Sequence, residues 1–355
     1  MKKIILILAL SFIATTSFAQ ELNLDEFKIN KLKLEFRVDY DHFSDGDSSG
    51  FSGRYLNFVI AGDITKDLFY AYRQRLNKIQ GNNNFFDATD YLYLGWRINK
   101  NFSLTVGKEV VAMGGIEYDL APIDVYFHSL FWNNFNCYEF GTNFIYTSSD
   151  EKNIITFQFT NSPFTRELYD NLYNYSLHWR GNFKHFDPVC SINLYEYKKG
   201  AFLNVIALGT SYQFGPVEGY LDFANRAHGD QQQFFFKDIT YIGRVGVIFW
   251  DKKMQLYVKG GCDVNDAQER DITAHAVHDI CIPPGSEMYF YGGGMEFFPL
   301  KGRDDIRIHA FLAVNDIDRD MKLDFATNTL TPTDIHGIFY QVNFGITWRL
   351  NFINR

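Results

Sequence analysis

The chain has 355 residues, a formal net charge of −8, and aromatic side chains at 18% of its positions. The acidic balance gives no support for a nucleic-acid-binding protein, because such proteins present basic surfaces. The mean hydropathy of −0.21 excludes a protein built from several membrane-spanning helices, each of which needs about 20 apolar residues.

The first residues have the pattern of an export signal. Two lysines precede an apolar run over residues 4–14, and the tripeptide 17–19 supplies the small residues of a cleavage site. The run is too short to cross a bilayer as a helix. We therefore expect residues 1–19 to be a signal peptide that is removed before Gln20, and residues 20–355 to form one exported domain.

Short strand-like segments follow one another from residue 31 to residue 351. Residues 341–350 show the pattern best, with apolar residues at every second position and small, polar or charged residues between them. No segment has a helical period. The pattern predicts an all-β fold, a transmembrane antiparallel β-barrel of about 16 strands with lipid on one face and water on the other. A soluble solenoid is the alternative, but the chain has no fixed repeat.

The connections between the predicted strands alternate in length. Short connections are typical of periplasmic turns and long ones of external loops. The connection at 198–200 departs from this alternation. Four tryptophans fall at or just past the ends of predicted strands that run toward the periplasm. The membrane interface on that side favours tryptophan. They are Trp96, Trp179, Trp250 and Trp348. The predicted strands begin near residues 31, 53, 68, 88, 102, 136, 153, 173, 189, 201, 217, 238, 254, 288, 306 and 336. The predicted turns are 63–67, 99–101, 148–152, 213–216 and 250–253, and the predicted long loops are 41–52, 76–87, 108–135, 263–287 and 315–335.

The alternation also separates charged from apolar residues. On the first predicted strand, Lys33 and Arg37 alternate with Leu34 and Phe36. An Arg or Lys on the lipid face costs about 2–4 kcal/mol at mid-membrane, so the charged set is expected to line the lumen. A barrel of sixteen strands leaves an aqueous channel. The predicted pore-lining residues are Lys33, Arg37, Arg73, Arg75, Arg97, Arg180, Lys259, Arg307, Glu139 and Glu296.

One external loop differs from the others. Residues 110–123 are apolar, contain glycine and have few polar residues, unlike a loop tip in water. We expect this third loop to fold inward and to narrow the pore, although an ordinary external loop that packs on its neighbours remains an alternative. The expected constriction residues are Met113, Gly114, Gly115, Glu117, Tyr118 and Asp119.

The stretch ATDYLYLGWRINKNFSLTVGKEVVAMGGIEYD, residues 88–119, resembles the phosphate-selective porin O and P family, in its form common in Bacteroidetes. The stretches YRQRLN at 72–77 and GGGMEFFPL at 292–300 are similar to it as well. The resemblance implies a sixteen-stranded outer-membrane barrel, usually a homotrimer, whose third loop narrows the pore. Founding members carry dense arginine and lysine ladders, whereas this chain has inward acids beside its bases. We therefore expect only a weak or modest anion preference.

These observations predict a passive bacterial outer-membrane porin, and not an enzyme, for small polar solutes or anions. Its expected partners are outer-membrane lipid and the solutes, with no nucleic acid, cofactor or metal. A barrel enzyme of the lipase or protease type and a barrel component of a secretion or adhesion assembly remain alternatives. Zinc binding by His275 and His278 is less favoured than a solvated loop. Pairing of Cys262 with Cys281, which flank one predicted loop, stays open.

Overall fold

A computed structural model describes residues 26–354 apart from 82–83, 165–169, 230, 232, 267–280, 284, 301–302, 304 and 325–328. The expected signal peptide, its cleavage site at Gln20, and His275 and His278 lie outside the described residues. Cys262 is a free cysteine, so it forms no disulfide with Cys281.

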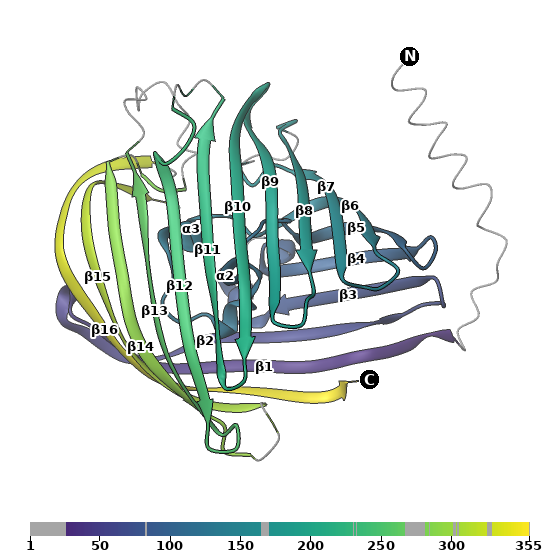
Figure 1. The fold of residues 1–355 in the computed structure, drawn as a ribbon, viewed down its shortest axis with the longest axis horizontal. Helices are drawn as coiled ribbons and strands as arrows, with labels where there is room; N and C mark the ends of the chain where they lie inside the picture. The colour runs from purple at the N-terminus through teal and green to yellow at the C-terminus, as the bar shows by residue number, and fades with distance from the viewer. Residues whose placement is uncertain are drawn as a thin grey trace.

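Sixteen antiparallel strands form a closed barrel, as predicted (Figure 1). Each strand pairs with its neighbours in the sequence, and β1 closes the sheet on β16. The strands are β1 (Lys28–Phe43), β2 (Ser48–Asp63), β3 (Leu68–Arg75), β4 (Thr89–Arg97), β5 (Phe102–Val110), β6 (Tyr138–Thr147), β7 (Asn153–Asn161), β8 (Tyr173–Gly181), β9 (Phe186–Lys198), β10 (Ala201–Phe214), β11 (Val217–His228), β12 (Asp238–Phe249), β13 (Met254–Asn265), β14 (Ser286–Phe297), β15 (Ile306–Asp324) and β16 (Thr329–Asn354).

The helical segments lie in the connections and are all short. Within the residues that the structure describes, two are α-helices, both in the connection between β5 and β6, and the others are 3₁₀ helices of three to six residues. Among the described residues, none of the helices has the length and apolar character that crossing a bilayer requires. The segments are η2 (Asp45–Asp47), η3 (Leu76–Gly81), η4 (Phe85–Ala88), α2 (Ile116–Asp119), η5 (Pro122–Asp124) and α3 (Leu130–Asn134).

Two predicted loops are wrong in extent. The sequence predicts loops at 41–52 and 315–335, but β1 continues to Phe43 and β15 continues to Asp324. The hydrogen-bonded hairpin therefore extends well into both predicted loops. Beyond the lipid, both faces of a strand meet water, so apolar residues no longer alternate with polar ones. The sequence then has the pattern of a loop although the backbone remains a strand.

Apolar side chains cover the outer face of the barrel. Leu92 and Leu94 on β4 and Leu256 and Val258 on β13 are exposed, and each pair is separated by a residue that points inward. This is the alternation expected of a wall between lipid and water. Trp250 follows β12 in a turn with φ of +54°, which explains why its position does not fit the alternation of its strand.

Candidate pore constriction

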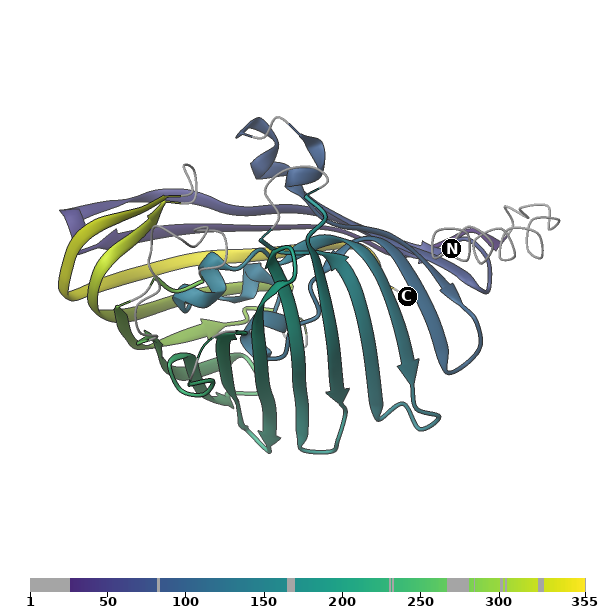
Figure 2. The same cartoon turned by 90° about the horizontal axis from the view of Figure 1, so that it is seen from above.

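The connection between β5 and β6, residues 111–137, lies inside the ring of strands; we call it loop L3. Figures 1 and 2 both show its helices α2 and α3 surrounded by the wall. Gly115 precedes α2 with φ of +105°, a conformation that other residues rarely adopt, and so lets the chain turn across the lumen. Ser129 caps α3, its Oγ accepting a hydrogen bond from the Trp132 amide at 3.0 Å.

The first half of L3 is fixed to strands β9 and β11. The Gly114 amide donates to Ser191 Oγ at 2.7 Å. The Ile116 and Glu117 amides donate to the two carboxylate oxygens of Asp222, at 2.7 and 2.8 Å. A Cβ added at Gly114 would lie 2.5 Å from a backbone oxygen of β10, so only glycine permits this approach.

A buried ion pair adds a third contact. Glu117 is 1% exposed, and its Oε2 lies 2.5 Å from Lys259 Nζ on β13. Tyr220 donates its hydroxyl to the same carboxylate at 3.0 Å, and Lys259 donates to the backbone oxygen of Phe127 as well. Breaking a buried pair of this kind costs about 3–5 kcal/mol because it leaves one charge uncompensated.

Apolar packing holds L3 against the same wall. Two clusters of buried residues join the loop to strands β9 to β15. In one, Met113 and Phe135 pack with Tyr195; in the other, Phe127 packs with Phe311 and Tyr257. This packing is why the apolar sequence of L3 is not exposed to water.

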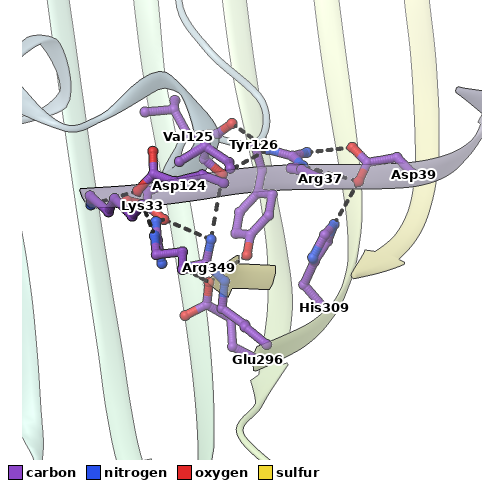
Figure 3. Close-up of polar contacts among 12 residues, drawn as sticks. Lys33, Arg37, Asp39, Asp124, Val125, Tyr126, Glu296, His309 and Arg349 are labelled. Atoms are coloured by element: carbon purple, nitrogen blue, oxygen red, sulfur yellow. Dashed lines mark hydrogen bonds and ion pairs between the residues drawn. The ribbon is translucent and has the colours of Figure 1, made fainter. Parts of the chain in front are cut away.

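The second half of L3 meets β1, β15 and β16 through arginines (Figure 3). Asp124 lies 2.7 Å from an Arg307 amino group and 2.5 Å from one of Arg349. Burial alone would raise the pKa of Asp124, but these two guanidinium groups lower it. Arg37 donates to the Val125 backbone oxygen at 2.9 Å. The arginines therefore hold the loop by both charge and backbone contacts.

Tyr126 lies at the centre of this contact (Figure 3). The guanidinium of Arg37 stands 4.6 Å from the centre of its ring, and that of Arg307 stands 5.6 Å away. Its hydroxyl donates to Glu296 at 2.5 Å. Arg37 also holds Asp39, at 2.6 Å, on its own strand. Each cation here has at least one carboxylate partner.

The structure brings six of the ten predicted pore-lining residues to L3. Arg37, Lys259, Arg307 and Glu296 touch it as described, and Arg180 pairs with Asp119 of the loop. Glu139 meets the loop at its C-terminal end, where it accepts a hydrogen bond from the Asn136 side-chain amide. The other four have ion-pair partners on the wall, which are Glu35 for Lys33, Asp90 for both Arg73 and Arg75, and Asp63 for Arg97.

The sequence pattern did not indicate the second half of the site. Asp124 and Tyr126 are not among the predicted constriction residues, and the ion pair of Asp124 with Arg349 was not predicted. The aromatic run from Tyr126 to Phe135 continues the apolar character of the first half of L3. This run was the feature of the sequence that could have indicated the second half of the site.

Cavities lie beside L3 within the barrel. One of about 580 Å³ is bordered by Asp119, Arg180 and Arg244. A second, of about 330 Å³, lies between Asp124 and Lys259 and shares Arg244 with the first. A third, of about 390 Å³, lies on the β4 to β8 side of the loop. The interior can therefore hold small polar molecules on more than one side of L3.

Comparison with known proteins gives a family and a set of similar folds. A model of the family "Phosphate-selective porin O and P" matches residues 30–216. Similar solved structures include the outer-membrane protein OmpT of Vibrio cholerae in its trimer form, with 10% identity, a TM-score of 0.58, and 92% of this chain and 100% of that chain covered. No curated protein matches the chain.

Two further structures have the same fold. The anion-selective porin from Comamonas acidovorans is 10% identical with a TM-score of 0.59, covering 92% of this chain and all of that one. The outer-membrane channel DcaP of Acinetobacter baumannii is 9% identical with a TM-score of 0.61, covering 94% of this chain and all of that one.

Proposed function

The chain belongs to the phosphate-selective porin O and P family, and we propose that it is a passive, non-catalytic channel of the bacterial outer membrane with a weak anion preference. The observation that carries this proposal is the loop fixed across the lumen with polar cavities beside it. A closed barrel with a charged, water-accessible interior lets small polar solutes pass without a conformational change.

The weak preference follows from the balance of charges. Around the 330 Å³ cavity, four bases stand against three acids: Arg244, Lys259, Arg307 and Arg349 against Asp124, Glu218 and Glu296. Around the 580 Å³ cavity the balance is reversed, with Arg180, Lys184 and Arg244 against Asp119, Glu151, Asp187 and Glu218. On the wall, Arg73 and Arg75 share the single carboxylate of Asp90. The excess of positive over negative side chains in the lumen is therefore small and confined to a few places.

Assembly and processing are part of the same proposal. The OmpT structure is described as a trimer, and the Comamonas porin as anion-selective. We propose a homotrimer here as well, embedded in outer-membrane lipid through the exposed apolar side chains of the wall. We also propose removal of residues 1–19 before Gln20. Native mass spectrometry in detergent would give the oligomeric state, and the mass of the mature chain would give the cleavage site.

Conductance in a planar bilayer tests the channel itself. We expect the purified, folded protein to produce stable, stepwise openings in KCl, and a zero-current potential in a salt gradient displaced slightly toward anions. Heat-denatured protein is the control. Absence of openings, together with lipase or protease activity of the same preparation, would favour a barrel enzyme. Absence of both would favour a component of a secretion or adhesion assembly.

A further inference from the structure

The cavity of about 390 Å³ between L3 and strands β4 to β8 has an unusual lining. Two acids border it, Glu109 on β5 and Asp119 on L3, and the described residues around it include no lysine or arginine. Tyr93, Asn143 and Thr156 complete much of its polar surface. The other two cavities are each bordered by both acids and bases, so this cavity differs from them in electrostatic character.

Glu109 is a buried acid with no cation beside it in the described part of the chain. Its side chain is 7% exposed, and it accepts hydrogen bonds from Thr105 at 2.7 Å and from Asn143 Nδ2 at 2.6 Å. It forms no ion pair with a described residue. Two comparably buried acids, Asp90 and Glu117, each have an Arg or Lys nitrogen within 2.6 Å. A buried carboxylate is costly unless a positive group compensates it.

Asn143 gives a second, independent indication. It is 7% exposed and lines the cavity, and its Nδ2 is committed to Glu109. Its Oδ1 is buried and has no hydrogen-bond donor among the described residues. Buried carbonyl groups of this kind are nearly always satisfied. Asn143 Oδ1 thus lacks a donor, and Glu109 lacks a compensating positive group, among the described residues.

Aromatic rings add a third feature. Tyr91 and Tyr93 border the cavity, with ring centres 6.1 Å apart and planes tilted by 45°. Aromatic faces attract ammonium and guanidinium groups. The Arg73 guanidinium already stands 4.9 Å from the centre of the Tyr91 ring, and Tyr93 is the ring beside it.

We propose that this cavity is a subsite for the ammonium group of a permeating solute, held by Glu109 and the neighbouring Asn143 carbonyl against Tyr93. An ammonium group is both a cation and a hydrogen-bond donor, which are the two partners that the site lacks. Asp119 borders both this cavity and the 580 Å³ cavity, so the subsite adjoins the 580 Å³ cavity. This assignment rests on the proposed channel function.

The test is block of single-channel current by a small linear diamine. Putrescine is added to wild-type channels at about 0.1 M KCl, where charges are screened only beyond about 10 Å. We expect a saturable reduction of current, and none from 1,4-butanediol, which has the same length without charge. In Glu109→Gln, the concentration for half block should rise about tenfold, as expected for losing a charge-assisted hydrogen bond.

Glu196→Gln is the matched comparison. Glu196, on β9, is 8% exposed, forms no ion pair with a described residue, and is not among the described residues that line the cavity. The variant removes the same charge from another part of the wall and should leave the half-block concentration nearly unchanged. Thr156→Lys is a second variant, which places a cation in the cavity without touching the hydrogen bonds of Glu109, and it should abolish the block.

Equal block of wild type, Glu109→Gln and Thr156→Lys would overturn the subsite, as would putrescine acting no more strongly than 1,4-butanediol. Channels that conduct KCl but ignore putrescine would contradict only the subsite. Protein that never conducts KCl would instead contradict the channel function on which it rests.

Discussion

At the scale of single residues, the most informative charges are the arginines that share one carboxylate. Arg73 and Arg75 share the carboxylate of Asp90, at 2.7 and 2.6 Å, and neither pairs with another acid among the described residues, so one positive charge is in excess there. We predict that Arg73→Glu with Arg75→Glu moves the zero-current potential in a KCl gradient toward cations. The shift should shrink near 1 M salt, where the Debye length falls to about 3 Å.

The same reversal at Arg303, an exposed base in the β14–β15 connection, is the control and should move the potential little. A potential that stays unchanged in the double variant at low salt would show that these side chains lie off the conducting path.

The alternation of residues predicted which charges face inward, because a charged side chain on the lipid face is costly. It could not give their partners: Arg307 and Asp124 are separated by 183 positions, and only the path of L3 brings them together.

At the scale of elements, L3 is the part that a deletion can remove without cutting the sheet. Replacing residues 113–120 with a short glycine linker should raise single-channel conductance, because α2 leaves the lumen while every strand keeps its backbone pairing. The deletion is best combined with Lys259→Met, since a buried lysine left without Glu117 would cost about 3–5 kcal/mol. Lys259→Met with Glu117→Gln, which neutralises both partners and retains residues 113–120, separates the two effects.

Conductance that does not change in a folded deletion variant would place the loop outside the path of the ions.

The strands themselves were largely predictable from the sequence. Several begin at the expected residue, among them Leu68, Asn153 and Val217, because turn residues and a return of apolar alternation coincide there. The interior path of L3 was predictable only as an apolar segment in the wrong place for water; its hydrogen bonds to Ser191 and Asp222 depend on the tertiary fold.

At the scale of the whole molecule, the family and the barrel agree, and the charges of the interior are unevenly distributed. Its interior divides around L3 into cavities with different charge balances, the β4 to β8 side being acidic among its described residues. Composition alone, with a net charge of −8, could not show this division, because it averages over the outer surface, the connections and the lumen.

The orientation of the barrel in the membrane is the remaining whole-molecule prediction. Long connections face the outside of the cell in this class of barrel. Because the strands are antiparallel, successive connections lie at opposite ends of the barrel. In a variant without native cysteines, we predict that cysteines at Asp45 and Lys199 react with an impermeant thiol reagent on intact cells. Cysteines at Lys184 and Asp251 should react only after the outer membrane is permeabilised. All four positions are exposed, so any difference reports the side of the membrane and not burial. Labelling of the second pair on intact cells would reverse the barrel and place L3 at the opposite mouth.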